Sequence, residues 1–181
     1  GRLRRPRVQP VGEWTIRLLV WELNARTFAI PGTARNCPVH PTSMRYLPIR
    51  LHPNQDLRAA LEAQLAQEHV RAAFVVQGIG SLGTAMIRFA GMSDATPLRG
   101  DMEILTLSGT LSPDGAHLHI TVADAQGQVL GGHVASGCIV RTTAEILVAL
   151  LPDYGFSREH DSESGCKELV VRTQARPDAS G

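Results

Sequence analysis

Aromatic residues, long apolar runs and closely spaced cysteines are scarce in this sequence, and each scarcity narrows what the protein can be. Only 4% of the 181 residues are aromatic although 43% are apolar, so we expect a core of Leu, Ile, Val and Ala. No segment approaches the ~18 consecutive apolar residues of a transmembrane helix. The basic, then apolar, first thirty residues are a poor fit to a secretory signal, because Arg17 and Glu22 interrupt the apolar run and no small-residue cleavage site follows.

Cysteine is sparse, and Cys37, Cys138 and Cys166 make an odd count without a C-x-x-C motif. This pattern excludes a dense disulfide framework and favours a reducing, cytoplasmic setting. Cys138 lies in an apolar, strand-like run, where a cysteine most often acts as a small buried hydrophobe.

A strong net charge is also absent, but the charge is unevenly distributed. The chain carries a net charge of +1, yet residues 1–43 hold seven arginines against two glutamates, whereas residues 44–172 hold ten basic and fourteen acidic residues. The acidic balance of residues 44–172 does not favour strong, phosphate-driven DNA binding by that part of the chain alone.

Composition divides the chain into three parts. Residues 1–43 contain five prolines and both tryptophans, and we interpret them as a basic, proline-containing extension that is either non-native or poorly ordered. Within the extension, residues 15–30 fit a strand or a helix equally well. Met44 is a candidate native start, and residues 44–172 form the predicted folded domain. Residues 173–181 are predicted to be a flexible tail.

From Met44 onward, the periodicity predicts a mainly antiparallel sheet with one principal helix, an α+β fold. Leu57, Leu61 and Leu65 repeat at helical spacing as far as about His69, and residues 53–56 supply a helix cap. Alternating or β-rich runs predict strands at 45–51, 72–77, 84–90, 103–111, 116–123, 128–141 and 168–172. Residues 143–151 are apolar nearly all round and fit a buried strand or a helix, and we favour a strand because the neighbouring elements are strands. Turns are predicted at 113–115 and 124–127, and a loop is predicted from residue 156 to the last strand.

Three glycines, Gly78, Gly80 and Gly83, match the bare pattern G-x-G-x-x-G. A dinucleotide site would need a long helix directly after the pattern and an acidic residue about 20 residues on, at the end of a second parallel strand. Neither feature is present, so we interpret the segment as a tight turn between two strands.

The most specific chemical pattern is a group of three histidines, His117 and His119 in H-L-H and His133 in G-G-H-V. Side chains repeat every two residues along a strand, so His117 and His119 share one face of the predicted sheet. Three imidazoles can bind zinc or a similar divalent metal and leave one coordination position open. The alternative is that these are hydrogen-bonded histidines on a polar sheet face.

The position of His133 depends on the turn that precedes it. A symmetric turn centred between Ala125 and Gln126 would place His133 on the opposite face from the other two histidines. One extra residue in the turn or strand, at Gly127 or in Gly131-Gly132, restores the shared face. A neighbouring subunit could supply ligands instead.

Two carboxylates, Glu103 and Asp124, are candidate acid–base groups or partners of the metal ligands, although each is more often a solvated or structural carboxylate. No Ser-His-Asp or Cys-His arrangement is evident. We therefore assign no catalytic residue.

Seven segments occur in an order that suggests a known family. They are L-H-P-N-Q-D-L-R-A-A-L (51–61), G-I-G-S-L-G-T-A-M-I-R (78–88), G-D-M-E-I-L-T-L-S-G-T-L (100–111), H-L-H-I-T-V-A-D (117–124), G-G-H-V (131–134), T-A-E-I-L (143–147) and F-S-R-E-H-D-S-E-S-G-C-K-E-L (156–169). Across residues 45–171 the chain resembles the PPC domain, the plants-and-prokaryotes conserved domain. In plants this domain accompanies AT-hooks in nuclear proteins, and in prokaryotes it stands alone.

The resemblance implies a compact α+β domain assembled as a homotrimer. It also implies that residues 100–105 correspond to the plant partner-binding motif G-R-F-E-I-L, with Asp101 in place of arginine and Met102 in place of the aromatic residue. The candidate partner-binding residues are Gly100, Asp101, Met102, Glu103, Ile104 and Leu105. Prokaryotic members tend to hold histidine at positions 117, 119 and 133. Their DNA-binding label derives from the plant AT-hook, whose R-G-R-P core is absent from Arg4-Arg5-Pro6-Arg7.

Together, the residues and the resemblance predict a cytoplasmic PPC-domain protein of the prokaryotic type that acts in DNA binding or regulation. It would be a homotrimer with DNA or a protein as its partner, and it would carry zinc or a similar divalent metal on His117, His119 and His133. The alternative is a metal-dependent enzyme or a small-molecule sensor that uses the same histidines.

Overall fold

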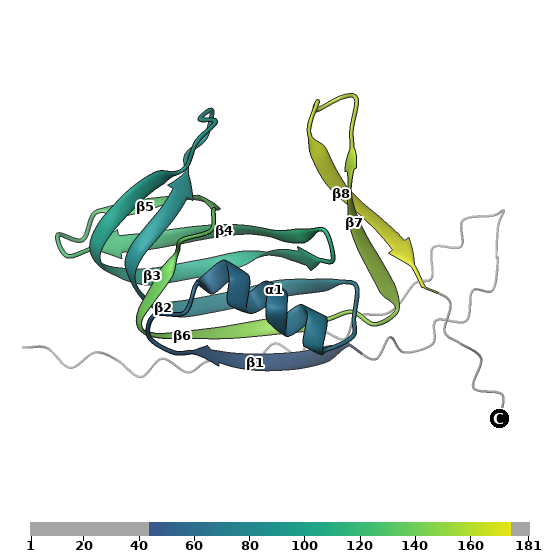
Figure 1. Ribbon diagram of the computed structural model, residues 1–181, viewed down its shortest axis with the longest axis horizontal. Helices are drawn as coiled ribbons and strands as arrows, with labels where there is room; N and C mark the ends of the chain where they lie inside the picture. Colours follow the sequence, from purple (N-terminus) through teal and green to yellow (C-terminus); the bar gives the residue numbers. More distant parts are fainter. Residues whose placement is uncertain (1–43, 175–181) are drawn as a thin grey trace, which may run out of the picture. The chain divides into compact units, whose positions relative to one another are not determined.

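The computed structural model describes residues 44–174, and the predictions for residues 1–43 and for most of the tail lie outside them. This part of the chain contains eight strands and one helix (Figure 1). In chain order they are β1 (Arg45–Leu51), α1 (Leu57–Gln67), β2 (Ala73–Arg88), β3 (Thr96–Ser112), β4 (Gly115–Asp124), β5 (Val129–Val134), β6 (Ile139–Leu150), β7 (Tyr154–His160) and β8 (Lys167–Thr173).

Six of the strands form one sheet in the order β1-β6-β2-β3-β4-β5, and every ladder in the sheet is antiparallel. The end of β2 also pairs with β5, so that β2, β3, β4 and β5 close into a ring. Strands β7 and β8 form a separate two-stranded hairpin. This arrangement confirms the predicted α+β fold with a mainly antiparallel sheet.

Helix α1 begins where the sequence predicts. Asp56 is its N-cap, and its side chain accepts a hydrogen bond from the backbone N–H of Ala59 at 3.1 Å. Leu57, Leu61 and Leu65 are buried on the face that packs against the sheet. At eleven residues, this described helix is too short to cross a bilayer.

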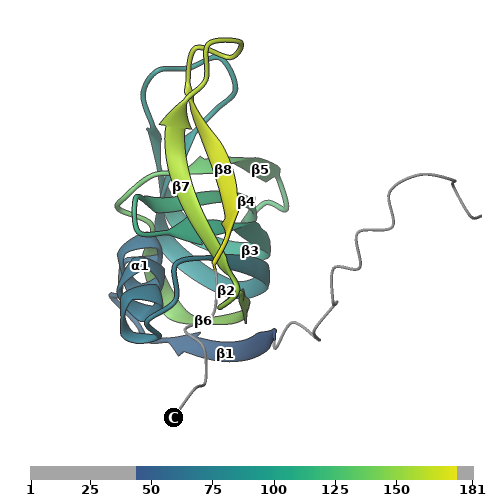
Figure 2. The same cartoon turned by 90° about the vertical axis from the view of Figure 1, so that its right-hand side faces the viewer.

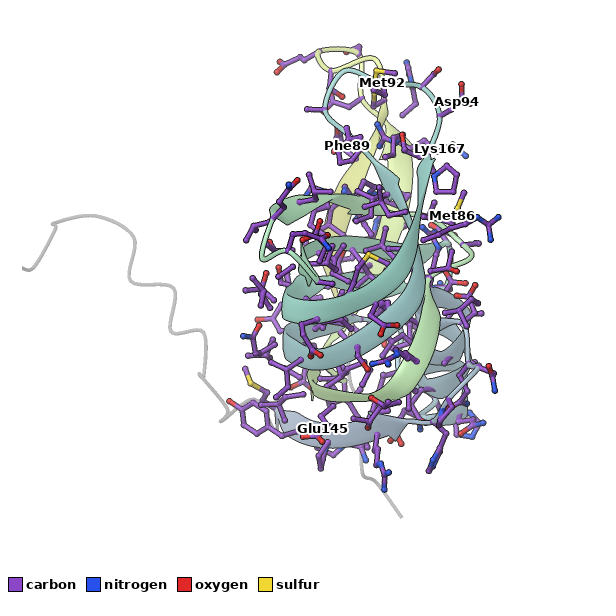
Figure 3. All side chains as sticks on the ribbon, turned by 90° about the vertical axis from the view of Figure 1, so that its left-hand side faces the viewer. Met86, Phe89, Met92, Asp94, Glu145 and Lys167 are labelled. Carbon is purple, nitrogen blue, oxygen red and sulfur yellow. The ribbon has the colours of Figure 1, made fainter. Side chains whose placement is uncertain are left out.

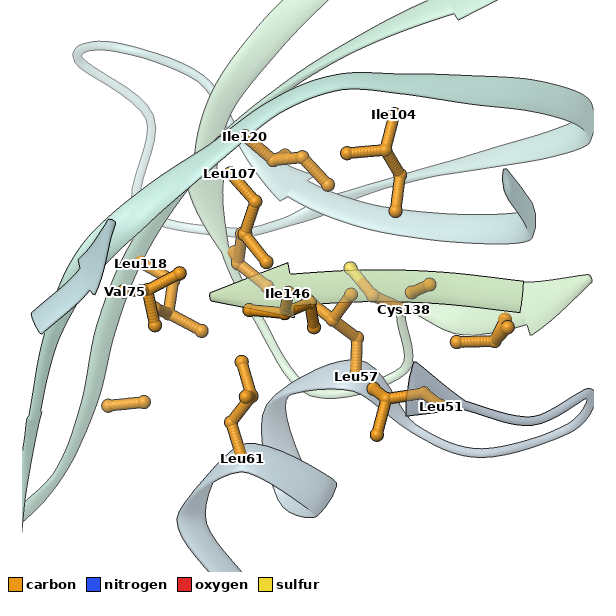
Figure 4. Close-up of a cluster of buried hydrophobic side chains, with 14 of the residues drawn as sticks. Leu51, Leu57, Leu61, Val75, Ile104, Leu107, Leu118, Ile120, Cys138 and Ile146 are labelled. Atoms are coloured by element: carbon orange, nitrogen blue, oxygen red, sulfur yellow. The ribbon is translucent and has the colours of Figure 1, made fainter. Parts of the chain in front are cut away.

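The core lies between α1 and the sheet. Figure 4 shows Leu57 and Leu61 of the helix directed toward aliphatic side chains of the sheet, among them Val75 and Ile146. Fully burying one leucine side chain stabilises the folded state by about 1.5–3 kcal/mol. As the composition predicts, the core contains mainly aliphatic side chains, together with Cys138.

The glycine pattern is not a turn, and this prediction was wrong. Strand β2 continues through residues 78–83 and pairs with β3 on one side and β6 on the other. Gly80 adopts φ +141°, and a Cβ atom there would lie 2.2 Å from the carbonyl oxygen of Thr143. A glycine is therefore required at position 80 because the backbones of β2 and β6 approach each other closely there. A turn does not account for this requirement.

The loop predicted from residue 156 is also wrong, because Tyr154–His160 is strand β7 and pairs with β8. The polar composition of this segment suggests a loop, but the cross-strand ladder satisfies its backbone. Its buried anchor is Phe156, whose ring meets that of Phe74 edge-on at a centroid distance of 5.5 Å. The run predicted at 128–141 is likewise divided between β5 and β6 by a short break.

Candidate metal centre

Strands β4 and β5 bring the three histidines to one sheet face. His119 is the direct cross-strand partner of His133, and His117 lies two residues before His119. Residues 125–128 connect the two strands, and within them Gly127 has φ +76° and donates its N–H to the carbonyl of Asp124 at 2.9 Å. This left-handed glycine supplies the extra residue that the shared face requires.

The imidazoles are close enough to share one ion. One ligand nitrogen from each ring can be chosen so that all three lie within 4.8 Å of one another. The Nε2 atoms of His117 and His119 are 3.2 Å apart. Zn–N bonds of about 2.0–2.1 Å in a tetrahedral site place ligand nitrogens about 3.3 Å apart. The spacing of His117 and His119 therefore matches that of two ligands on one zinc ion.

The surroundings keep two of the rings neutral. Burial lowers the pKa of His133 to about 4, with further contributions from His117 and Arg88. Burial, followed by the charge of Arg158, also lowers the pKa of His117. A neutral imidazole is the form that binds a metal, so these two groups are ready to act as ligands at pH ~7 without losing a proton first.

His133 carries an unusual polar atom. Its Nδ1 is buried and has no hydrogen-bond partner, and it is the only buried side-chain nitrogen or oxygen of which this is true within residues 44–174. Leaving such a group unpaired costs about 1–3 kcal/mol. A metal ligand set accounts for a neutral, partly buried imidazole with an unpartnered Nδ1 more directly than a polar sheet face does, so the residues present fit a divalent metal.

A pocket of about 360 Å³ opens beside the histidines. Its wall includes Ser108, Thr110, Arg158 and Leu169. Arg158 and Leu169 belong to the β7–β8 hairpin, which stands beside the sheet in Figure 1 and in front of β3 and β4 in Figure 2. Sequence reasoning missed this wall, because the spacing of residues within β7 gives no indication that the hairpin folds over β4.

Arg88 is a second residue that the sequence analysis did not connect with the site. It is the cross-strand partner of His133 on β2, so its side chain leaves the sheet on the same face. Arg88 lies beside His133 because the end of β2 pairs with β5, and no local sequence pattern predicts that pairing.

The two candidate carboxylates lie outside the histidine cluster. Asp124 Oδ1 accepts hydrogen bonds from the backbone N–H groups of Gln126 and Gln128 at 2.9 and 2.8 Å, and so holds the turn. Glu103 is exposed on β3, opposite Ser81 and Ala123. Asp124 thus has a structural role, which is the commoner role of a carboxylate at a turn.

The candidate partner-binding segment forms part of β3, where burial alternates. Met102 and Ile104 belong to the core, whereas Gly100, Asp101, Glu103 and Leu105 are exposed. Asp101 forms an ion pair with Arg141 at 2.8 Å. Any partner would therefore contact the exposed residues of the segment.

Within residues 44–174, the sheet, helix α1 and the histidine group together define a small α+β domain with a candidate three-imidazole metal centre. Comparison with known families is more specific: the chain belongs to the Plants and Prokaryotes Conserved (PCC) domain family, whose profile matches residues 39–152. This confirms the resemblance found in the sequence. The matched residues end before β7, so the hairpin with Arg158 lies beyond them.

Two curated relatives illustrate where the domain occurs. The chain is 46% identical over 138 residues to a bifunctional protein GlmU from a Synechococcus strain, covering 76% of this chain but 22% of that protein. It is 33% identical over 99 residues to AT-hook motif nuclear-localized protein 21 from Arabidopsis thaliana, covering 51% and 35%. The chain thus spans less than a quarter of the first relative and about a third of the second.

Solved structures with the same fold come from several prokaryotes. A hypothetical protein from Salmonella has a TM-score of 0.72 at 38% identity, covering 75% of this chain and 99% of that one. A metal-containing protein from Archaeoglobus fulgidus has 0.59 at 24% identity, covering 70% and 93%. A candidate DNA-binding protein from Ralstonia eutropha has 0.60 at 26% identity, covering 69% and 90%.

Proposed function

We propose that this protein is a metal-binding regulatory member of its family, in which His117, His119 and His133 hold one zinc or similar divalent ion. The observation that carries the proposal is the convergence of three imidazoles on one face, with the buried Nδ1 of His133 unpartnered. That a structural relative is a metal-containing protein adds support. Three protein ligands leave a coordination position for water or for a ligand.

The regulatory partner is DNA or another protein. The candidate DNA-binding protein among the structural relatives favours DNA, whereas the acidic balance of residues 44–172 opposes strong binding of phosphates by this part alone. For a protein partner, we propose contact through the exposed residues Gly100, Asp101, Glu103 and Leu105, and we place this activity in the cytoplasm, as the cysteine pattern favours.

We also propose that the protein assembles as a homotrimer. Support comes from the outer apolar face, which we define as the surface of β1, β2 and β6 that bears Tyr46, Pro48, Ile79 and Leu147. Tyr46 is 63% exposed and Ile79 is 50% exposed, and a shallow pocket includes Pro48, Ile79 and Leu147. Apolar patches of this kind mark interaction surfaces.

A second candidate function is a metal-dependent enzyme or small-molecule sensor. The observation that favours it is the pocket beside the histidines, because an open coordination position that faces a cavity can take a ligand. A bound metal would act there as a Lewis acid or would activate a water molecule.

Metal analysis of untagged protein tests the proposed centre. The wild type should contain about one divalent ion per chain, and the His117→Ala/His119→Ala/His133→Ala variant should contain none. The matched control is His52→Ala/His160→Ala, since both of these histidines are exposed and lie outside the cluster. Equal metal content in the wild type and the triple variant would contradict the proposal.

Retention on duplex DNA, measured over a range of salt concentrations, distinguishes the two kinds of partner. Phosphate-driven binding weakens steeply as salt rises. Retention at low salt that is lost as salt increases would favour DNA. Absence of retention at low salt would leave a protein as the partner. In that case Glu103→Arg should weaken binding of the partner protein in a pull-down.

A further inference from the structure

We infer that the pocket beside the candidate metal centre binds a small molecule through an oxyanion group, a carboxylate or a phosphate, held between the metal and the guanidinium of Arg158. The inference rests on the metal centre proposed above and deepens it by naming the chemical class of its ligand. It assigns a ligand-positioning role to a residue of the β7–β8 hairpin, outside the residues that the family profile matches.

Arg158 is fixed at the pocket by contacts on both of its ends. Its backbone N–H donates to Asp114 Oδ2 at 2.8 Å, and its Nη2 donates to Thr110 Oγ1 at 2.7 Å. Asp114 and Thr110 both belong to the β3–β4 hairpin, which also carries His117. The guanidinium therefore enters the pocket already ordered, with further N–H donors beyond the one bound to Thr110.

The charges around the histidines are not balanced by the protein. Arg158 and Arg88 are among the arginines of residues 44–174 that form no ion pair with a carboxylate. Among the described residues that line the pocket, Arg158 carries a positive charge and none is a carboxylate. An oxyanion would complete the charge balance and match the fork of Arg158.

The dimensions and the overall charge favour a small molecule over a nucleic-acid backbone. The pocket volume of about 360 Å³ lies in the range of small-molecule sites. Residues 44–172 carry more acidic than basic groups, which disfavours strong binding of a phosphate backbone by this part of the chain. Leu169 adds an apolar wall against which the rest of a ligand can lie.

The test uses the full chain loaded with Co²⁺, whose visible absorption reports changes in the coordination sphere. Inorganic phosphate and acetate are titrated separately into wild type, Arg158→Gln, Arg158→Lys and the control Arg172→Gln. Arg172 lies on the same hairpin but pairs with Glu159 and does not line the pocket. Metal content and the melting temperature are measured for every variant, so that loss of the ion or of the fold is recognised separately.

We expect at least one of the two probes to change the spectrum of the wild type and of Arg172→Gln with the same affinity. Arg158→Gln should retain the metal and weaken that binding at least tenfold, and Arg158→Lys, which keeps the charge without the fork, should give an intermediate value. If Arg158→Gln loses the metal or does not fold, the test depends on Arg158→Lys alone. The inference then requires that Arg158→Lys weaken binding of the anion several-fold.

Three results would overturn the inference. Metal uptake with no spectral response to millimolar phosphate or acetate would reject the oxyanion site and leave the metal centre standing. Absence of metal in the wild type would reject both. A spectral response to duplex DNA but to neither small anion would assign Arg158 to nucleic-acid binding instead.

Discussion

At the scale of single residues, the three histidines combine two properties that rarely occur together. They converge closely enough to interact, yet His117 and His133 have pKa values lowered by burial, so they do not repel one another as cations near pH ~7. A polar sheet face would leave its imidazoles hydrated, whereas a metal site needs them neutral. Burial therefore prepares these residues for a ligand role.

Removing one imidazole tests how much each contributes. In the proposed centre three ligands share one ion, so His119→Ala should lower the affinity for Zn²⁺ by at least about a hundredfold, above the 10–100-fold typical of an outer-shell partner. His52→Ala, at an exposed position outside the cluster, should leave the affinity unchanged. Competition with a chromophoric chelator measures both variants. Equal affinities would mean that His119 is not a ligand.

Cys138 illustrates the opposite use of burial. Its Sγ accepts the N–H of Met86 at 3.2 Å, and burial raises the pKa of its thiol from 9.0 to about 11. The thiolate fraction at pH ~8 is therefore about a hundredfold below that of an ordinary cysteine. Since the folded pKa is raised, this thiol stabilises the fold below about pH 9, and that contribution is lost as the pH rises toward 11.

A variant that leaves Cys138 as the remaining cysteine makes this measurable. Cys37→Ser/Cys166→Ser should react with a thiol reagent at pH ~8 only after denaturant is added, whereas Cys166, which is exposed, should react in the folded wild type. Rapid reaction of the folded double variant would show that the thiol is accessible.

At the scale of strands and turns, the glycine pattern provides an internal comparison. Gly80→Ala should lower the free energy of unfolding by roughly 2–4 kcal/mol, because its φ is strained for alanine and its Cβ would meet the backbone of Thr143. Gly83→Ala should change it by less than about 0.5 kcal/mol, because the nearest atom, on Arg141, is 4.0 Å away. Denaturant unfolding tests the pair, and equal losses would contradict this explanation.

The start of α1 is joined to the sheet by a single carboxylate. Asp56 caps the helix through Oδ1, and its Oδ2 accepts the N–H of Gly137 at 2.6 Å. Asp56→Ala should therefore destabilise the protein by about 2–3 kcal/mol, combining a lost cap with an unpaired N–H. Asp56→Asn should lose less, because its amide oxygen can retain one of the two bonds. Thermal melts compare the two variants, and equal losses would show that one bond dominates.

The elements differ in how well sequence alone predicts them. The strand over 45–51, the helix and its cap were predicted because their signals are local: alternation, leucine spacing and a capping aspartate. The sequence predicts that His133 shares a face with His117 and His119 only if one extra residue lies in the turn or in the strand. Gly127 is one of the two positions that the sequence offers for this residue, and the structure pairs His119 with His133. β7 and its Arg158 could not be predicted, because their position depends on pairing with β8 and packing on Phe74.

At the scale of the whole molecule, the histidine pocket and the outer apolar face lie on different strands of the sheet. The pocket involves β3, β4 and the β7–β8 hairpin, whereas the outer apolar face belongs to β1, β2 and β6. No residue lines both the histidine pocket and the shallow pocket of the outer apolar face. The two proposals can be tested independently by substitution.

The proposed homotrimer can be tested at the outer apolar face. Leu147 is half-exposed on the outer apolar face, directly opposite Pro48, so Leu147→Glu should place a charge in the proposed interface and convert the trimer to monomers. Met92→Glu is the control, since Met92 is 56% exposed near the tip of the β2–β3 hairpin, far from Glu145 of β6 in Figure 3. Analytical ultracentrifugation should report trimers for the wild type and for Met92→Glu. A buried, unpaired carboxylate opposes association by several kcal/mol, so a Leu147→Glu variant that remains trimeric would mean that this face is not the interface. A monomeric wild type would contradict the proposed trimer.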